Sequence, residues 1–249
     1  MTTSWAWLTH TEPFSELDQP ESPAAFVVEQ VADRVFRIPL DRGFQYNPPG
    51  EAPIRVTQET LPTTDFASIP SYMSWFVSRY GRHTPAALVH DQLVIDDMPA
   101  ADRVRADRRF LEMMDSLDVP PVRSRVMWSA VSLATRWHGS TSARIGILVW
   151  GVAAAAGISL LTYGIATLHG LAILVALVLP AIAALLWGSQ YSAGLIGGYA
   201  LPIVVLPAAA SMLGYGSYWL IESVVRLARK VLPHNRRKDL PRPVAFHEK

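Results

Sequence analysis

One stretch decides the fold of this chain: residues 145–221, which begin IGILVWGVAAAAGISLLTYGIATL and continue to Ile221 without an Asp, Glu, Lys or Arg. A helix of a soluble protein normally keeps a charged, wetted face, and these 77 residues leave none. A helix of about 20 apolar residues is long enough to cross a bilayer. The stretch therefore predicts an integral membrane protein with more than one spanning helix.

Turn-forming residues divide this stretch into three parts. They predict an all-α transmembrane bundle of about three helices, over residues 145–168, 171–187 and 191–213. Residues 218–249 then predict an amphipathic helix on the membrane surface and a basic cytoplasmic tail.

Individual side chains of the stretch suggest how these helices pack. Gly194, Gly197 and Gly198 offer small faces for close helix contacts. Trp150, Trp187, Tyr191 and Trp219 are expected in the aromatic belts at the membrane interfaces. The only ionisable side chain near the bilayer, His169, is expected in a connecting loop.

Charge is distributed unevenly around the apolar stretch. Residues 1–144 carry 18 acidic and 14 basic side chains, a net charge of −4, whereas residues 222–249 carry three acidic and eight basic ones, a net charge of +5. Basic residues that flank the stretch on both sides favour an even number of crossings, because cytoplasmic segments are rich in Lys and Arg. Length favours three crossings, which we expect. Since residues 1–23 lack a signal peptide, we expect a multi-pass inner-membrane protein with its N-terminal domain in the cytoplasm.

The N-terminal part predicts a soluble α+β domain over residues 25–140. Residues 1–24, rich in Pro, Ser, Thr and Glu, are expected to form a disordered tail. Short apolar runs between turn residues predict a small antiparallel sheet, with strands at 26–28, 34–38, 44–46 and 54–56. Three helices follow, over 84–95 with Thr84 as N-cap, 99–117 and 120–137, each opened by proline. An apolar stripe on the third is expected to face the core: Val122, Val126, Ala130, Leu133 and Trp137.

Three short motifs in this part resemble an uncharacterised family. Residues 64–70 read TDFASIP, residues 86–93 read AALVHDQL, and residues 106–114 read ADRRFLEMM. In this order they resemble the domain of unknown function 1353 family of phage and bacterial genomes, over about residues 26–137. Gln92 and Val94 stand at aromatic positions of the family pattern, and the Gly usual before its first motif is missing. The resemblance implies a domain identity without an established activity, and the apolar stretch lies outside it.

Four polar residues of these motifs form the candidate site. Helical spacing places Asp107 on the inward face of its helix, and His90 faces inward by the same argument, with Asp91 about 100° around the helix. A buried carboxylate needs a partner, so these side chains could converge. The candidate catalytic residues are Asp65, His90, Asp91 and Asp107, and the candidate metal ligands are His90, Asp91 and Asp107.

Two interpretations of this cluster stay open. Carboxylates with an imidazole suit Mg²⁺, Mn²⁺ or Zn²⁺ and the hydrolysis of an ester or phosphoester, so the cofactor is unknown, with a divalent metal considered. Alternatively the cluster is a polar clamp, in which Asp65 caps the turn at residues 68–70 and a hydrogen bond between His90 and Asp107 ties two helices together. Ser68 lacks the surroundings of a nucleophile elbow.

Two functions follow from these observations. The first is a membrane-anchored accessory or interaction protein, because the spans lack the buried charge that a transport path normally carries. The alternative is a membrane-tethered metal-dependent hydrolase, so enzymatic activity is left open. The chain has no Cys, which excludes disulfides and thiol catalysis. The Arg residues of 103–109 alternate with acidic residues, so we expect no nucleic acid as a partner. The expected partners are the lipid bilayer and other membrane or cytoplasmic proteins.

Overall fold

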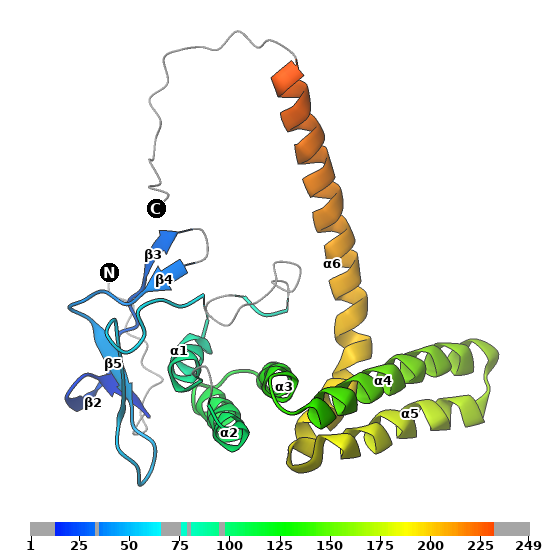
Figure 1. The fold of residues 1–249 in the computed structure, drawn as a ribbon, viewed down its shortest axis with the longest axis horizontal. Helices are drawn as coiled ribbons and strands as arrows, with labels where there is room; N and C mark the ends of the chain where they lie inside the picture. Colours follow the sequence, from blue (N-terminus) through cyan, green and yellow to red (C-terminus); the bar gives the residue numbers. More distant parts are fainter. Residues whose placement is uncertain (1–12, 33–34, 66–75, 79–80, 95–97, 232–249) are drawn as a thin grey trace.

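A small β part, three short helices and a long apolar helical part follow one another in the computed structural model (Figure 1). The model describes residues 13–32, 35–65, 76–78, 81–94 and 98–231. The strands are β1 (Phe14–Glu16), β2 (Gln19–Pro23), β3 (Glu29–Ala32), β4 (Val35–Arg37), β5 (Gly43–Tyr46) and β6 (Ile54–Thr57). The helices are α1 (Thr84–Leu93), α2 (Ala100–Ser116), α3 (Pro121–Trp137), α4 (Thr141–Thr167), α5 (Gly170–Ala184), the 3-10 helix η2 (Leu185–Gln190) and α6 (Tyr191–Val231).

The strands form two antiparallel sheets, one of four strands in the order β2-β1-β5-β6 and one of the two strands β3 and β4. The strands expected at 44–46 and 54–56 are confirmed as β5 and β6, and the one at 34–38 as β4. The strand expected at 26–28 lies instead at residues 29–32. The N-terminal part is thus α+β, with small antiparallel sheets followed by helices, as predicted.

The prediction of a disordered tail over residues 1–24 is wrong for residues 14–23, where the chain forms β1 and β2. β1 pairs with β5 along its whole length, and the ring of Phe14 packs 5.2 Å from that of Tyr46 in the core. The burial of one aromatic ring and a ladder of backbone hydrogen bonds hold this segment, although its composition is polar. Residues 1–12 lie outside the described residues.

The three predicted helices of the domain are confirmed as α1, α2 and α3. Thr84 is the first residue of α1 rather than its N-cap, and its hydroxyl accepts a hydrogen bond from the Gly81 amide at 2.8 Å. On α2, Asp107 is buried, as expected from its inward position, together with Phe110 and Met114.

The face that α3 buries differs from the expected apolar stripe. Val122 is 70% exposed, and the buried residues are mostly small and polar: Ser124, Met127, Ser129, Ser132 and Thr135. The reason is close packing of α3 against α2 and α6. The Ser129 hydroxyl donates to the Ala193 carbonyl at 2.8 Å, and a Cβ added to Gly197 of α6 would lie 2.5 Å from the Ser129 oxygen.

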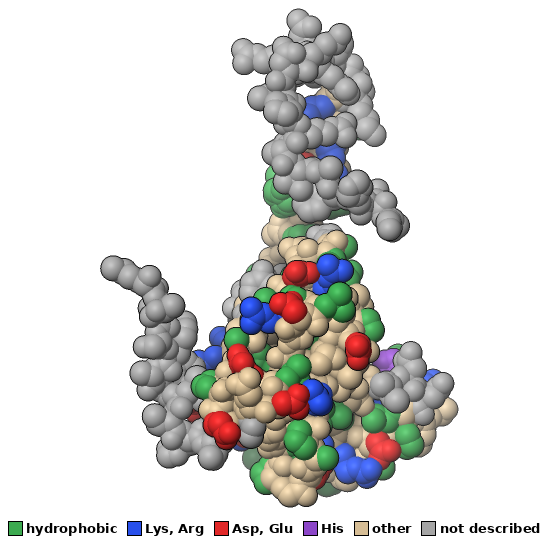
Figure 2. Space-filling view, turned by 90° about the vertical axis from the view of Figure 1, so that its left-hand side faces the viewer, with side chains coloured by type: hydrophobic (Ala, Val, Ile, Leu, Met, Phe, Trp, Pro, Cys, Tyr) green, Lys and Arg blue, Asp and Glu red, His purple; other side chains and the backbone are tan. Residues whose placement is uncertain are grey.

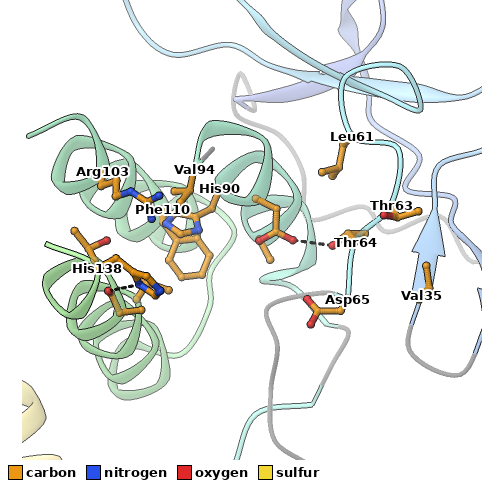
Figure 3. Close-up of a pocket in the computed structure, with 15 residues that line it drawn as sticks. Val35, Leu61, Thr63, Thr64, Asp65, His90, Val94, Arg103, Phe110 and His138 are labelled. Atoms are coloured by element: carbon orange, nitrogen blue, oxygen red, sulfur yellow. Dashed lines mark hydrogen bonds between the residues drawn. The ribbon is translucent and has the colours of Figure 1, made fainter. Parts of the chain in front are cut away.

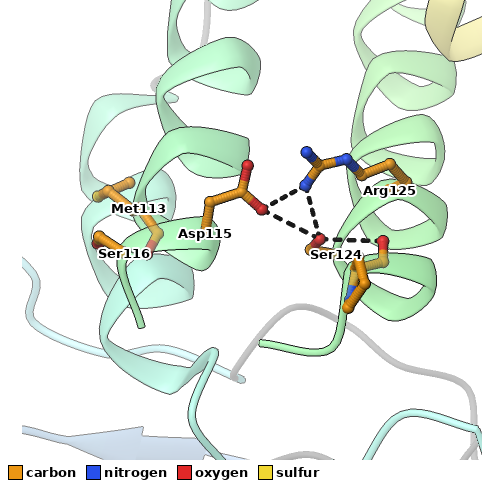
Figure 4. Close-up of polar contacts among 6 residues, drawn as sticks. Met113, Asp115, Ser116, Ser124 and Arg125 are labelled. Carbon is orange, nitrogen blue, oxygen red and sulfur yellow. Dashed lines mark hydrogen bonds and ion pairs between the residues drawn. The ribbon is translucent and has the colours of Figure 1, made fainter. Parts of the chain in front are cut away.

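Polar contacts also fix the start of α3 against the end of α2 (Figure 4). The Ser124 hydroxyl lies 3.3 Å from the carboxylate of Asp115, which also forms an ion pair with Arg125. Small hydroxyl side chains allow the two helix backbones to approach more closely than Leu or Val would.

The apolar part begins with an antiparallel hairpin of α4 and α5. Its turn is formed by Leu168, with a left-handed φ of 53°, and by His169, whose Nδ1 accepts from the Ala172 amide at 3.2 Å. Two segments, Thr141–Thr167 and Gly170–Arg229, are long and apolar enough to cross a membrane, by length and composition. The helix expected to end at residue 213 continues to Val231, because glycines alone do not end a helix whose flanking residues favour it.

Trp150 and Trp187 are buried in this part rather than placed in an interfacial belt. Their rings meet edge to face at 5.0 Å, and the Trp150 indole donates to the Gly194 carbonyl at 3.0 Å. A Cβ on Gly194 would lie 2.5 Å from the Trp187 ring, and one on Gly198 would lie 3.2 Å from Pro180. The small faces predicted for the glycines of α6 are therefore confirmed, and the two indoles fill the space beside them.

Candidate functional site

His90 and Asp107 form a hydrogen-bonded pair between α1 and α2, as predicted. His90 Nε2 lies 2.9 Å from Asp107 Oδ1. Only 1% of the Asp107 side chain is exposed, against 13% of the His90 side chain. The other carboxylate oxygen, Oδ2, is buried without a hydrogen-bond partner in the part of the chain that the structure describes. The imidazole packs 5.0 Å from the ring of Phe110, so it is held on two sides.

Asp91, the next residue, makes a separate contact with the β side of the domain. Its Oδ2 accepts a hydrogen bond from the Thr64 hydroxyl at 2.7 Å. Thr64 is fixed in turn by two backbone hydrogen bonds to Phe36, each of 2.9 Å. Burial raises the pKa of the Asp91 carboxyl, and the nearby Asp65 raises it further, whereas the bond from Thr64 and the charge of His90 act against this.

His90 and Asp91 therefore point in different directions from the last turn of α1, one toward Asp107 and the other toward Thr64. Two consecutive helical residues are about 100° apart, which is enough to send one side chain to α2 and the other to Thr64. Within the described ranges, no group of three or more His, Asp or Glu side chains is placed to hold a metal ion. The arrangement joins Asp107 to His90 and leaves Asp91 outside that pair.

A pocket of about 570 Å³ brings three of the four candidate residues together, Asp65, His90 and Asp91. Arg103 and His138 also line it, and sequence reasoning had assigned neither to the site. Figure 3 places Arg103, His90 and His138 on the helical side, and Thr63, Thr64 and Asp65 on the opposite side. The helical wall thus carries Arg103 and two imidazoles, and the opposite wall carries the Asp65 carboxylate; Asp91 comes from α1 and accepts a hydrogen bond from Thr64.

His138 occupies the residue after α3 and is oriented by its own helix. Its Nδ1 lies 2.9 Å from the Ala134 carbonyl, so this nitrogen carries the proton and Nε2 is the acceptor when the ring is neutral. Val131, Ala134 and Thr135 line the pocket from the same helix. Their spacing with His138, at i, i+3, i+4 and i+7, is a helical stripe that could have identified this wall from the sequence.

His83 takes no part in this pocket. It is buried at the other end of α1, where its Nε2 has no hydrogen-bond partner among the described residues. Burial lowers the pKa of His83, a hydrogen bond with the Ser78 backbone opposes this, and Arg123 lowers it further. The predicted cap of Asp65 on the turn at residues 68–70, and Ser68 itself, lie outside the described residues.

Residues 38–131 match the family described as Protein of unknown function (DUF1353), which is the family that the three motifs indicated. The match includes Asp65, His90, Asp91, Arg103 and Asp107, and it ends within α3, before His138. No curated protein and no solved structure matches the chain. The domain therefore carries a family identity, and helices α4 to α6 lie outside the matched segment.

Proposed function

We propose that this protein is a membrane-anchored accessory protein, in which α4 to α6 contact lipid and the DUF1353 domain binds a partner. The surface of α4 to α6 carries the proposal. Large apolar side chains such as Val152, Ile203 and Leu213 are exposed over these helices. No Asp, Glu, Lys or Arg occurs between Ile145 and Ile221. A continuous apolar surface of this size is a site of membrane or protein contact.

The surface of the preceding domain has the opposite character. Figure 2 shows acidic and basic side chains scattered over its face. Several form ion pairs, as Arg37 does with Glu29 at 3.0 Å and Arg108 with Glu112 at 3.3 Å. Such a surface suits an aqueous compartment, and the basic residues on both sides of the apolar part favour the cytoplasm.

The pocket supports the binding role of the domain. Its volume of about 570 Å³ lies within the range of roughly 300–1,000 Å³ typical of ligand sites. The carboxylates of Asp65 and Asp91, together with Arg103 and two imidazoles, provide polar groups that could orient a segment of a protein partner. We expect the partner to dock at this opening.

Two matched substitutions test the anchorage. Val152 on α4 is 71% exposed and Val122 on α3 is 70% exposed, so their side chains are equally accessible in the two parts of the chain. Arg at position 152 would enter the bilayer, at a cost of roughly 2.5–3.5 kcal/mol near its centre. We expect Val152→Arg to reduce the fraction of chain that resists extraction by alkaline carbonate, and Val122→Arg to leave it unchanged. Complete extraction of the unmodified chain would contradict the proposal.

One observation favours the alternative function, a membrane-tethered hydrolase. The imidazole of His90 lines the pocket while a buried carboxylate orients it, as a general base requires. The purified chain can be assayed against ester and phosphoester substrates, with and without added divalent metal. Turnover that disappears in a folded His90→Gln variant would establish this alternative, and the absence of turnover in the unmodified chain would exclude it for these substrates.

A further inference from the structure

Arg136, near the end of α3, joins the domain to the base of the α4–α5 hairpin. Its guanidinium donates to the carbonyls of Leu186 and Trp187, at 2.8 and 2.9 Å, and lies 5.5 Å from the centre of the Trp187 ring. The last carbonyls of a helix lack partners within the helix and carry partial negative charge, so a cation is stabilised there. Burial lowers the pKa of Arg136. The two carbonyls take the place of water at its two terminal nitrogens, whereas its buried Nε has no hydrogen-bond partner among the described residues.

The two ends of the hairpin lie at the same level, beside Arg136. A Cβ added to Gly146, near the start of α4, would lie 3.4 Å from the Leu186 carbonyl and 3.7 Å from the Arg136 guanidinium. The turn of the hairpin, at Leu168, lies at the far end and is 89% exposed. The hairpin therefore leaves the domain and returns to it (Figure 1). The 27 residues of α4 extend about 40 Å, which exceeds a hydrocarbon core of about 30 Å.

α6 runs in a different direction from the hairpin. It begins against α3, where Ala193 accepts the hydrogen bond of Ser129, and then rises at a steep angle to α4 and α5, on the side of the domain (Figure 1). If α6 stood along the membrane normal, the hairpin would lie in the membrane plane and the charged domain would be at bilayer depth. Placing charged side chains there is costly, so the normal follows the hairpin.

We infer that the α4–α5 hairpin crosses the bilayer twice and that α6 lies along the surface of the anionic inner leaflet, between lipid and domain. The inference rests on the proposed membrane anchorage. It places the domain and the end of α6 on the cytoplasmic side, with two crossings in place of three. The basic residues on both sides of the apolar part then lie in the cytoplasm, as the positive-inside rule expects.

The end of α6 has the chemistry of an interfacial helix. Tyr218 and Trp219 are exposed aromatic side chains of the kind enriched at headgroup level. Arg226, paired with Glu222 at 3.0 Å, and Arg229 follow within three turns and would face anionic headgroups. Such a helix buries its apolar face roughly 5–10 Å into the boundary between headgroups and acyl chains.

Single cysteines in this Cys-free chain test the arrangement in sealed vesicles of known orientation, with a membrane-impermeant maleimide. Ser116→Cys reports the side of the domain, Leu168→Cys reports the hairpin turn, and a Cys added after Lys249 reports the end of α6. We expect the first and third to react from the same side and Leu168→Cys from the opposite side only. Leu213→Cys, in the middle of α6, should react at least tenfold more slowly than Ser116→Cys from either side.

Three results would overturn the inference while the anchorage stands. In the first, the added C-terminal Cys reacts from the same side of the membrane as Leu168→Cys. In the second, Leu168→Cys reacts from the same side as Ser116→Cys. In the third, Leu213→Cys reacts rapidly. Each variant is labelled again after solubilisation in detergent, so that a thiol shielded by lipid is distinguished from one buried in protein. Release of the whole chain from the vesicles by alkaline carbonate would overturn the anchorage itself, and the inference with it.

Discussion

Replacing His90 by Ala should destabilise the domain strongly, because Asp107 would lose the partner that it has among the described residues. The Asp107 side chain is 1% exposed, and its second oxygen already lacks a hydrogen bond within the described residues. Breaking a buried pair by removal of one member costs about 3–5 kcal/mol, since a buried carboxylate then has no compensation. His90 is somewhat more exposed than Asp107, so we take the lower end, about 3 kcal/mol, which is roughly 100-fold in the folding equilibrium.

A double-mutant cycle separates this pairing from simple loss of side-chain volume. His90→Ala, Asp107→Ala and the double variant are prepared as full chains in detergent micelles. Their unfolding by urea is followed through the near-ultraviolet circular dichroism of the aromatic side chains. We expect the double variant to be less destabilised than the sum of the single variants by more than 1 kcal/mol, because removal of both groups leaves no buried charge. Asp107→Asn, which retains a hydrogen bond to the imidazole, should cost less than His90→Ala.

Additive effects within about 0.5 kcal/mol would refute this reasoning, because residues that interact do not behave independently. The pair would then contribute nothing specific to stability. In that case the retention of a buried carboxylate beside His90 would have to serve the chemistry of the pocket.

Three further predictions concern packing and pH. Gly194→Ala should destabilise the chain by about 1–3 kcal/mol in thermal unfolding, because its Cβ would lie 2.5 Å from the buried Trp187 ring, whereas Gly151→Ala, with no atom within 4 Å, should not. Stability should fall as pH drops below the ordinary His83 pKa of 6.5, because burial lowers that pKa and the unfolded chain then binds the extra proton; a His83→Gln variant should show a shallower fall. Burial raises the pKa of Asp91 above 3.8, so the contribution of this carboxyl to stability is greatest below pH 3.8 and is lost as the pH rises through the raised pKa. The Asp91→Asn variant should lack this loss of stability, and an identical dependence of stability on pH in the variant and the unmodified chain would contradict the prediction.

The pairing of His90 with Asp107 could be predicted because the inward orientation of each residue follows from the geometry of its own helix. Helical spacing placed both residues on inward faces, and a buried carboxylate demands a partner. The same spacing placed Asp91 about 100° around the helix but could not identify its partner. Its partner, Thr64, is fixed by an antiparallel bridge to Phe36, and that long-range contact leaves no periodic signal in the sequence.

The face of α3 and the positions of the two indoles could not be predicted for a related reason. Periodicity identifies an apolar stripe, and it assumes that the apolar stripe is the buried one. α3 packs against α6 through Ser129 and Gly197, where backbone proximity is more important than side-chain volume. Trp150 and Trp187 fill the space that the small residues of α6 leave, so a pattern typical of an interfacial belt belongs here to a buried contact.

α3 is the element through which the domain and the apolar part are built into one structure. One face of α3 supplies Val131, Thr135 and His138 to the pocket, and another supplies Ser129 and Arg136 to α6 and the hairpin. The family match ends at residue 131, so Arg136 and His138 both lie beyond it. The contact of Arg136 with the hairpin is therefore made outside the matched segment, whereas Ser129, inside it, holds α6. His138, also outside the matched segment, completes one wall of the pocket. Any partner that fills the pocket beside His138 would contact the helix that holds the hairpin.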